Sequence, residues 1–154
     1  MILDRQLLLS ENQDLSQTAA NYLSTNSIDL GTTGTIPGVG GTPVSDVGRG
    51  TPKNLFVQVT ETFTSGGAAT LQVHVVSGTA VDGNGQLSAG VKIHNSSRVY
   101  ALADLVAGKQ LEVAIPPGID QRYLALRYDI GTATTTAGTV TAGIVLDRQT
   151  NPTV

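Results

Sequence analysis

Apolar and polar residues alternate along several stretches of the chain, and residues 71–75 (LQVHV) show the pattern at its clearest. The alternating stretches are residues 55–63, 71–75, 111–115, 124–130 and 140–146. A period of two residues is typical of a β-strand with one buried face. With shorter candidate strands at residues 2–8, 28–30 and 97–103, the pattern predicts about eight strands.

Turn-forming residues separate these stretches. Ser65-Gly66-Gly67 lies between the first two, where a β-hairpin would turn. Further turns are marked by Asp82-Gly83-Asn84-Gly85, by Pro116-Pro117-Gly118 and by the Thr- and Ala-rich residues 131–138. The only helical signal is a single turn over residues 101–106. Short strands separated by turns predict an all-β fold of the sandwich, jelly-roll or barrel type.

Two segments do not follow the alternation. Residues 1–27 begin apolar and become polar at Ser10, and we interpret them as an extended N-terminal arm. Residues 28–154 are then expected to form a single β-sandwich domain. Within that domain, residues 31–53 are rich in Gly and Pro and predict a long loop. Loops of this length are uncommon in compact domains and are usually either functional or spacers without fixed structure.

Composition adds that the chain carries little charge. Charged residues make up 14% of the 154 residues, and the formal net charge is −3. This balance disfavours a nucleic-acid partner, because nucleic-acid binders usually carry a basic surface. No apolar run reaches the length of about 18 residues that a membrane span requires, so we expect no membrane partner. The chain has no cysteine and no signal-peptide pattern, and we expect it to be made in a cytoplasm.

The residues that could carry out chemistry do not form a recognised motif. His74 lies on the polar side of its strand and His94 precedes a turn, so both are interpreted as surface histidines. They lack the HxH or HxxxH spacing of a shared metal site. A Ser-His-Asp triad stays open because triads are recognised by geometry, but the GxSxG motif is absent. We therefore expect that the protein is not an enzyme.

Two glycine-rich segments resemble ligand-binding loops only in part. Asp82-Gly83-Asn84-Gly85 begins like a calcium loop, but Leu87 and Ile93 occupy the positions that require Gly and a bidentate Glu. Gly38-Val39-Gly40-Gly41 lacks the Lys-Ser/Thr pair and the following helix of a phosphate-binding loop. We expect no metal and no cofactor.

The first part of the chain carries a family resemblance. The segments involved, in order, are Leu9–Gln13 (LSENQ), Ala19-Ala20, Ser27–Gly31 (SIDLG), Val47–Pro52 (VGRGTP) and Leu55–Val59 (LFVQV). This succession resembles the small capsid cement (decoration) proteins of tailed bacteriophages, particularly the podovirus type of Bordetella phage. The resemblance covers residues 1–63, and the long insertion Thr32–Thr42 departs from the commoner pattern.

The resemblance implies a jelly-roll-like β-sandwich that forms a homodimer or a homotrimer. It also implies binding to the outside of an icosahedral capsid, where the protein would stabilise contacts between major capsid protein subunits. The protein would then be made in the host bacterial cytoplasm and be found on the outer capsid surface of the virion. The family offers no catalytic residue to transfer to this chain.

Two sets of residues are candidate contacts with the capsid or with a neighbouring copy. Leu7, Leu8 and Leu9 are consecutive, so an isolated strand cannot turn all of them toward one face. In the loop, the candidate contacts are Ile36, Val39, Val44 and Val47, with Arg49 as an ionic contact. The alternative for the loop is a spacer that contacts nothing.

A second function class stays open beside the structural one. The alternative is a β-sandwich receptor- or glycan-binding module of a phage tail fibre or an adhesin. Sugar sites usually stack a ring on an exposed aromatic side chain, but aromatic residues are only 4% of the chain. Tyr123 and Tyr128 lie in one stretch on opposite sides, and Tyr128 is expected in the core. Exposed aromatic residues gathered at one loop end would favour this alternative.

Overall fold

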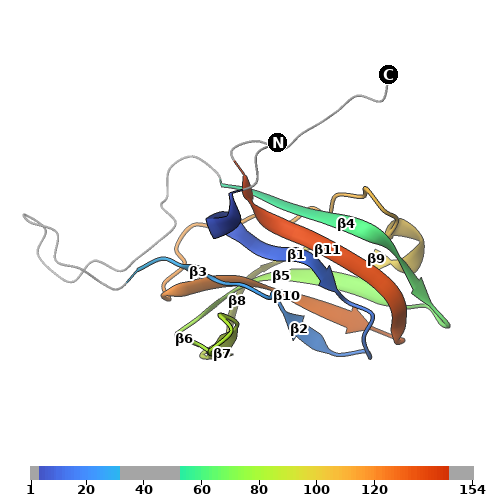
Figure 1. The fold of residues 1–154 in the computed structure, drawn as a ribbon, viewed down its shortest axis with the longest axis horizontal. Coiled ribbons are helices and arrows are strands. Elements are labelled where there is room, and N and C mark those ends of the chain that lie inside the picture. The colour runs from blue at the N-terminus through green and yellow to red at the C-terminus, as the bar shows by residue number, and fades with distance from the viewer. Residues whose placement is uncertain (1–3, 32–52, 146–154) are drawn as a thin grey trace, which may run out of the picture.

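The structure, a computed structural model, describes residues 4–31 and 53–145, and their regular elements are almost all strands (Figure 1). The strands are β1 (Leu8–Asp14), β2 (Asn21–Leu23), β3 (Ile28–Asp29), β4 (Asn54–Ser65), β5 (Thr70–Gly78), β6 (Ala80–Val81), β7 (Leu87–Ala89), β8 (Lys92–Ser96), β9 (Tyr100–Ala101), β10 (Tyr123–Gly131) and β11 (Thr135–Val145). Two short 3-10 helices are η1 (Arg5–Leu7) and η2 (Leu102–Asp104). The second helix confirms the helical turn expected at residues 101–106.

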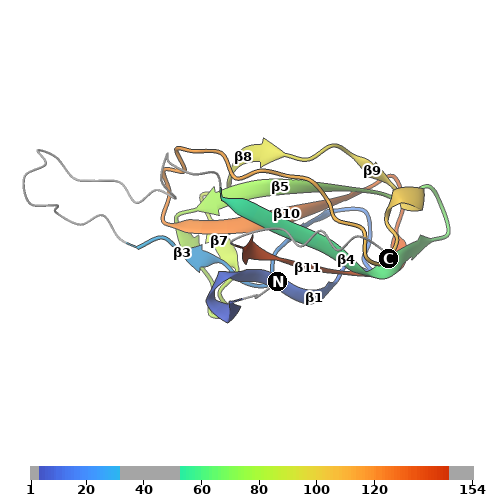
Figure 2. The same ribbon diagram turned by 90° about the horizontal axis from the view of Figure 1, so that it is seen from above.

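The strands form two antiparallel sheets and a small hairpin. The three-stranded sheet has the order β1-β11-β4. The six-stranded sheet has the order β2-β10-β5-β8, and within it β3 also pairs with β10 and β9 with β5. Strands β6 and β7 pair separately. Figures 1 and 2 show the two larger sheets packed face to face, so the predicted all-β sandwich is confirmed.

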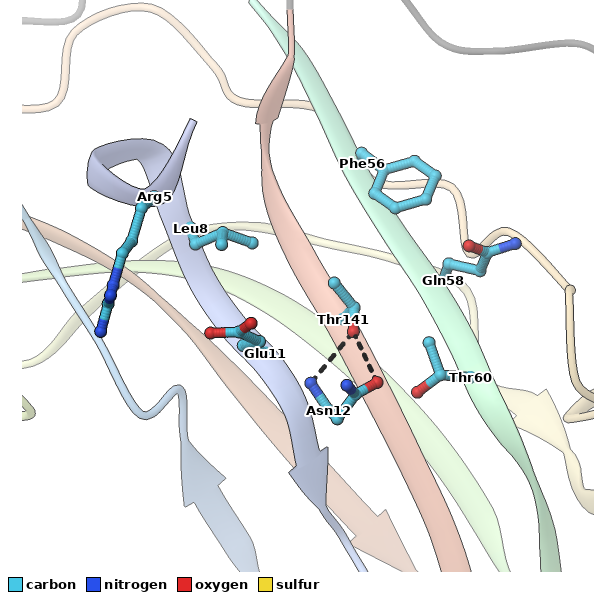
Figure 3. A pocket seen from close by; sticks show the side chains of 8 residues that line it. All are labelled: Arg5, Leu8, Glu11, Asn12, Phe56, Gln58, Thr60 and Thr141. Carbon is cyan, nitrogen blue, oxygen red and sulfur yellow. Dashed lines mark hydrogen bonds between the residues drawn. The ribbon is translucent and has the colours of Figure 1, made fainter. Parts of the chain in front are cut away.

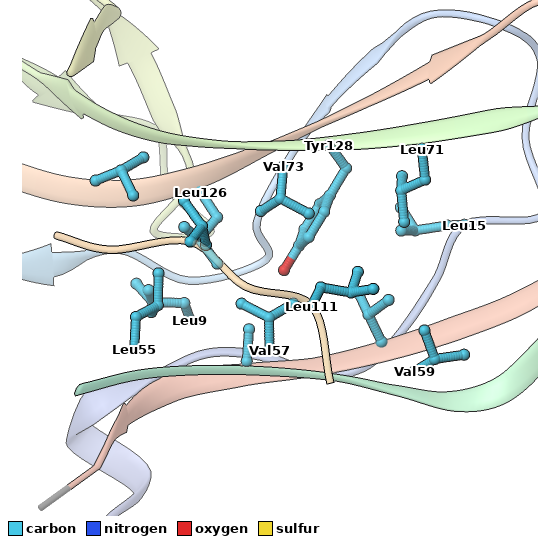
Figure 4. Close-up of a cluster of buried hydrophobic side chains, with 14 of the residues drawn as sticks. Leu9, Leu15, Leu55, Val57, Val59, Leu71, Val73, Leu111, Leu126 and Tyr128 are labelled. Carbon is cyan, nitrogen blue, oxygen red and sulfur yellow. The ribbon is translucent and has the colours of Figure 1, made fainter. Parts of the chain in front are cut away.

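The hydrophobic core lies between the two sheets (Figure 4). From β4, Leu55, Val57 and Val59 pack in the core, as the alternation of that stretch predicts. The six-stranded sheet contributes Leu71, Val73, Val75, Leu124, Leu126, Tyr128 and Ile130. Tyr128 is fully buried, which confirms its expected place. Each buried Val or Leu side chain contributes about 1.5–3 kcal/mol relative to exposure to water.

The hairpin predicted at Ser65-Gly66-Gly67 is wrong. Strand β4 pairs with β11, whereas β5 pairs with β10 and β8, so residues 65–67 carry the chain from one sheet to the other. The segment between β10 and β11 crosses at the same end of the sandwich. A Cβ placed on Gly67 would lie 3.0 Å from the Cβ of Ala133, so the two crossovers touch. The glycines of this turn are therefore explained by the close approach of two chain segments, and a hairpin is not needed to account for them.

Residues 111–115 keep the predicted burial pattern without forming a strand. Leu111, Val113 and Ile115 are buried and the residues between them are exposed, although the segment has no regular secondary structure. The backbone N–H of Leu111 donates to the carbonyl oxygen of Val57 at 2.8 Å. The chain leading into Leu111 therefore lies along the outer edge of β4. It covers backbone groups of β4 that could otherwise pair with another strand.

The structure corrects the interpretation of residues 1–27 as an arm. Residues 8–14 form β1, which pairs with β11, and β2 pairs with β10 in the other sheet. Leu9 is 1% exposed and Leu15 is fully buried. The consecutive leucines fit into a strand because Leu9 faces the core while Leu8 lies on the outer face against Gly143 of β11. Residues 1–3 lie outside the described part of the chain.

The long loop is described only at its ends, since residues 32–52 lie outside the described part. Within residues 4–31 and 53–145, no helix is long and apolar enough to cross a membrane.

Candidate functional site

A groove of about 660 Å³ lies on the outer face of the three-stranded sheet, beside β1 (Figure 3). The residues that define this β1 groove are Arg5, Leu8, Glu11, Asn12, Phe56, Gln58, Thr60 and Thr141. Two neighbouring hollows of about 510 and 650 Å³ share Glu11 with it. The concave surface therefore continues around β1, and it is open to solvent rather than enclosed.

A bulge in β1 shapes the groove. The register between β1 and β11 shifts between Ser10 and Gln13, and Asn12 adopts a left-handed backbone conformation with φ of 44°. Asparagine tolerates this conformation better than most residues. The Asn12 N–H donates to Thr141 Oγ1 at 3.0 Å, and the Thr141 hydroxyl donates to Asn12 Oδ1 at 3.2 Å. As a result Glu11 and Asn12 are both exposed, although they are consecutive in a strand.

Buried hydrogen bonds fix the bulge from inside. The Ser10 hydroxyl donates to Gln13 Oε1 at 2.7 Å, so the Tyr128 hydroxyl, 2.8 Å from Ser10 Oγ, is the donor to it. Burial raises the pKa of Tyr128, which keeps its hydroxyl protonated. Gln13 Nε2 donates to the Leu23 carbonyl at 2.8 Å. These contacts link β1 across the core to both β10 and β2.

Hydroxyl groups dominate the rest of the outer face of the three-stranded sheet. The Oγ1 atoms of Thr60 and Thr139 are 2.8 Å apart, and those of Thr64 and Thr136 are also 2.8 Å apart. Each pair joins β4 to β11, and cross-strand threonine pairs of this kind stabilise sheets. A hydroxyl has one donor and two acceptor sites, so each pair keeps acceptor capacity for a partner.

The charged residues of the β1 groove are Arg5 and Glu11. Within the described residues neither takes part in an ion pair. Both side chains lie on the β1 side of the groove, while β4 and β11 supply only uncharged side chains (Figure 3). A partner that brought a carboxylate or an amine to this side would find an unpaired opposite charge.

The outer face of the six-stranded sheet carries a different polar cluster. His74 Nδ1 is 2.6 Å from Ser96 Oγ, and His74 Nε2 is 2.9 Å from Asp129 Oδ2. Arg127 donates to both oxygens of Asp129, at 2.8 Å each. His74 is only 6% exposed, so its interpretation as a surface histidine is wrong. A Ser-His-Asp set that the sequence left open is therefore brought together by β8, β5 and β10.

His94 takes part in a second Ser-His contact. Its Nε2 is 2.6 Å from the Oγ of the buried Ser77, whose hydroxyl donates to Gln121 Oε1 at 2.5 Å. Gln121 in turn donates to the Gly90 carbonyl at 2.9 Å. Because the Ser77 hydrogen is used by Gln121, His94 Nε2 is the donor to Ser77. Burial, followed by the nearby Lys92, lowers the pKa of His94.

The start of the predicted docking loop is held by a bidentate ion pair. Arg122 donates to Asp29 at 2.9 and 2.7 Å, and the Gly31 N–H donates to the same carboxylate at 2.8 Å. The hydrogen bonds from Arg122 and then Gly31 lower the pKa of Asp29 to about 2. The Arg122 guanidinium also lies 4.8 Å from the centre of the Tyr123 ring.

The structure separates the residues predicted as contacts. Leu8 lines the β1 groove and is 8% exposed, and Leu7 is half-buried beside it. Leu9 packs in the core and has no surface to offer, so its prediction as a contact is wrong. The loop contacts Ile36, Val39, Val44, Val47 and Arg49 lie outside the described residues.

Sequence reasoning missed most of the groove. The sequence places Glu11 and Asn12 in the expected arm, and for Gln58, Thr60 and Thr141 the alternation predicts only that they face outward. The available signal was the polar run Glu11-Asn12-Gln13, which breaks the period-two alternation of a strand with one buried face, as an extra residue in a bulge does. Among residues 4–31 and 53–145, no group of three or more His, Cys, Asp or Glu side chains is placed to hold a metal ion.

These features define an antiparallel β-sandwich with an open, hydroxyl-rich groove on one sheet. The Bbp16 family model matches residues 9–144, which run from β1 into β11 and include both sheets. The chain belongs to the Bbp16 family. Bbp16 is a Bordetella phage protein family, so the protein is phage-related. A comparison with curated proteins finds no match.

Proposed function

We propose that the protein is a structural virion protein that binds the outside of an icosahedral phage capsid. There it stabilises contacts between neighbouring major capsid protein subunits. The observation that carries this proposal is the match to a phage protein family over residues 9–144, which covers the whole described sandwich except its ends. The localisation that follows is the outer capsid surface, after synthesis in the host cytoplasm.

The chemistry of the three-stranded sheet supports the proposal. A protein that clamps subunits together needs a broad complementary surface rather than a deep pocket. The β1 groove is open, with the buried side chains of Leu8 and Phe56 at its floor and threonine, asparagine and glutamine around them. Interfaces combine an apolar centre with a polar rim in the same way. We therefore assign this face to the capsid contact.

Self-association would strengthen such a contact. A homodimer or homotrimer presents two or three copies of the groove at once, and linked contacts bind far more tightly than one contact alone. Closed symmetry also suits a protein that is repeated over an icosahedral shell. A weak contact per groove is then sufficient for stable decoration.

The positions of the aromatic residues weigh against the glycan-binding alternative. Tyr22 packs against the main core, while Tyr123 packs against a separate small cluster on the outer face of the six-stranded sheet. Tyr100 and Tyr128 are buried. The half-exposed tyrosines therefore lie in different surroundings and do not form one stacking platform at a loop end.

The proposal is tested by adding the purified protein to purified empty capsids that lack it and sedimenting the capsids. We expect saturable co-sedimentation, and a higher temperature of capsid disruption with the protein bound. Thr60→Arg places a long cation in the β1 groove and should reduce binding at least tenfold. The matched control Ser88→Arg, on the exposed part of β7, should bind like the unmodified protein.

Absence of co-sedimentation by the unmodified protein would contradict the capsid role itself. Equal binding by the Thr60→Arg and unmodified proteins would keep the capsid role but remove the β1 groove as the contact.

A further inference from the structure

Ser96, His74 and Asp129 meet on the outer face of the six-stranded sheet, on three adjacent strands. His74 is the cross-strand partner of Ser96 on β8, and the next strand, β10, carries Asp129. The distances are 2.6 Å from His74 Nδ1 to Ser96 Oγ and 2.9 Å from His74 Nε2 to Asp129 Oδ2. Strands β5 and β10 pair without interruption here, and Ser96 pairs with His74 at the end of β8, close to a register shift between β5 and β8.

The contacts determine which nitrogen of His74 carries the proton. The Asp129 carboxylate is an acceptor, and Arg127 donates to both of its oxygens at 2.8 Å. His74 must therefore donate from Nε2, and a neutral imidazole has only one N–H. Its Nδ1 is then an acceptor, so the Ser96 hydroxyl donates to it. This is the hydrogen-bond order of a serine nucleophile, its base and the group that orients the base.

Solvent access distinguishes Ser96 from the second Ser-His contact. Ser96 is exposed, while the imidazole of His74 beneath it is almost completely buried. Ser77, beside His94, has no exposed surface, and its hydroxyl donates to Gln121 instead of to the histidine. Of these two serines, only Ser96 is accessible to solvent and donates its hydroxyl hydrogen to an imidazole.

We propose that Ser96 is a nucleophilic modification site that accepts acyl groups from activated esters. Ser96 Oγ attacks the ester carbonyl carbon while its proton passes to His74 Nδ1. The bond to the leaving oxygen then breaks, and the departing alcohol takes that proton from His74. The products are acyl-Ser96 and a free alcohol, with His74 neutral again. This inference goes beyond the capsid role and does not depend on it.

The surroundings also determine how far the reaction proceeds. The Ser96 N–H donates to Asn95 Oδ1 at 2.9 Å and is not free to stabilise an oxyanion. An activated ester acylates Ser96 without that stabilisation because its leaving group departs readily, whereas hydrolysis of the acyl-serine must expel the poorer serine alkoxide and depends more on oxyanion stabilisation. We therefore expect a stoichiometric, long-lived adduct instead of rapid turnover.

The test is incubation of the full chain with p-nitrophenyl acetate, followed by peptide mapping by mass spectrometry. We expect acetylation of Ser96 to be about 100-fold faster than that of the exposed Ser88, as a positioned general base typically provides. Release of p-nitrophenolate should stop near one equivalent per chain. Ser96→Ala should abolish this burst, and the matched control Ser88→Ala should keep it.

Asp129→Asn tests the role of the base separately from the fold. It should slow acetylation of Ser96 while the circular dichroism spectrum stays that of the unmodified protein. Acetylation of Ser96 at the same rate as Ser88 in the unmodified chain would overturn the proposal, and that result does not depend on whether any variant folds.

Discussion

The outer faces of the two sheets differ in how their polar groups are used. The ion pairs found among the described residues all involve β3, β5, β8, β10 or the segments that join them, and none involves β1, β4 or β11. Part of the six-stranded sheet is also covered by the β6–β7 hairpin, where Val76, Leu87 and Ala125 form a small cluster. The three-stranded sheet instead presents paired threonines and the open β1 groove.

This difference shows which face is available for a partner. Charged groups on the six-stranded sheet already have partners within the chain, so binding there would have to replace existing contacts. On the three-stranded sheet the hydroxyl and amide groups keep unused hydrogen-bonding capacity, and Arg5 and Glu11 have no ion pair within the described residues. The difference therefore supports the proposal that a partner binds the three-stranded sheet, while the polar groups of the six-stranded sheet contribute to stability.

The largest expected effect tests whether β1 belongs to the sandwich. Leu9→Ala should lower the free energy of unfolding by about 3 kcal/mol, because it leaves a cavity in the core. Urea denaturation followed by circular dichroism measures this change. Leu7→Ala, at the half-buried neighbour, is the matched control and should cost much less. If both variants lost the same small amount of unfolding free energy, β1 would not be part of the folded core and the interpretation as an arm would be supported.

The next effect tests the internal role of the cluster on the six-stranded sheet. Asp129→Ala leaves Arg127 and the buried His74 without their acceptor, and we expect a loss of about 2 kcal/mol. Thermal and urea unfolding should agree on the size of the loss. A change in unfolding free energy below about 0.5 kcal/mol is typical of ordinary surface sites. It would mean that the polar groups of this face contribute no more to stability than those of the three-stranded sheet.

A smaller effect should appear as a pH dependence. The pKa of Asp29 is lowered to about 2 by Arg122 and Gly31, from 3.8 without these partners. Its contribution to stability is therefore complete above about pH 4 and is lost as the pH falls toward 2. The stability difference between the unmodified protein and Asp29→Asn should be constant from neutral pH to about pH 4 and shrink below it. A difference that stayed constant down to pH 2 would contradict the ion pair.

The smallest effect concerns the threonine face. Thr60→Ala removes one hydroxyl of an exposed pair, and we expect a loss of at most about 0.5 kcal/mol in unfolding measurements. The same substitution should weaken capsid binding more than it weakens the fold. A large loss of stability would show that these hydroxyl groups are needed within the chain and are not free for recognition.

The sequence predicted those strands whose burial follows a simple period. In residues 55–63, 71–75, 124–130 and 140–146 the apolar side chains of one alternating set face the core, and each stretch overlaps a long strand. Which strands pair with each other was harder to predict from the sequence. Ser65-Gly66-Gly67 has hairpin composition, but β4 and β5 lie in different sheets, where β4 pairs with β11 and β5 pairs with β10, both far away in the sequence.

The candidate site was harder to predict than the fold. The β1 groove combines residues from both ends of the chain, and its shape depends on a bulge at Asn12 that alternation does not reveal. The contact between His74 and Asp129 spans 55 residues, and only the register of β5 and β10 brings the two side chains together. Such sites follow from strand pairing, so they could not be predicted before the pairing was known.

The central claim, that the outer face of the three-stranded sheet meets the capsid, is tested most directly by photo-crosslinking. A benzophenone amino acid placed at Thr60 in the β1 groove is compared with the same group at Ser88 on β7. After binding to empty capsids and irradiation, we expect a crosslink to the major capsid protein from position 60 and none from position 88. Crosslinks to the capsid protein from position 88 alone would contradict the claim.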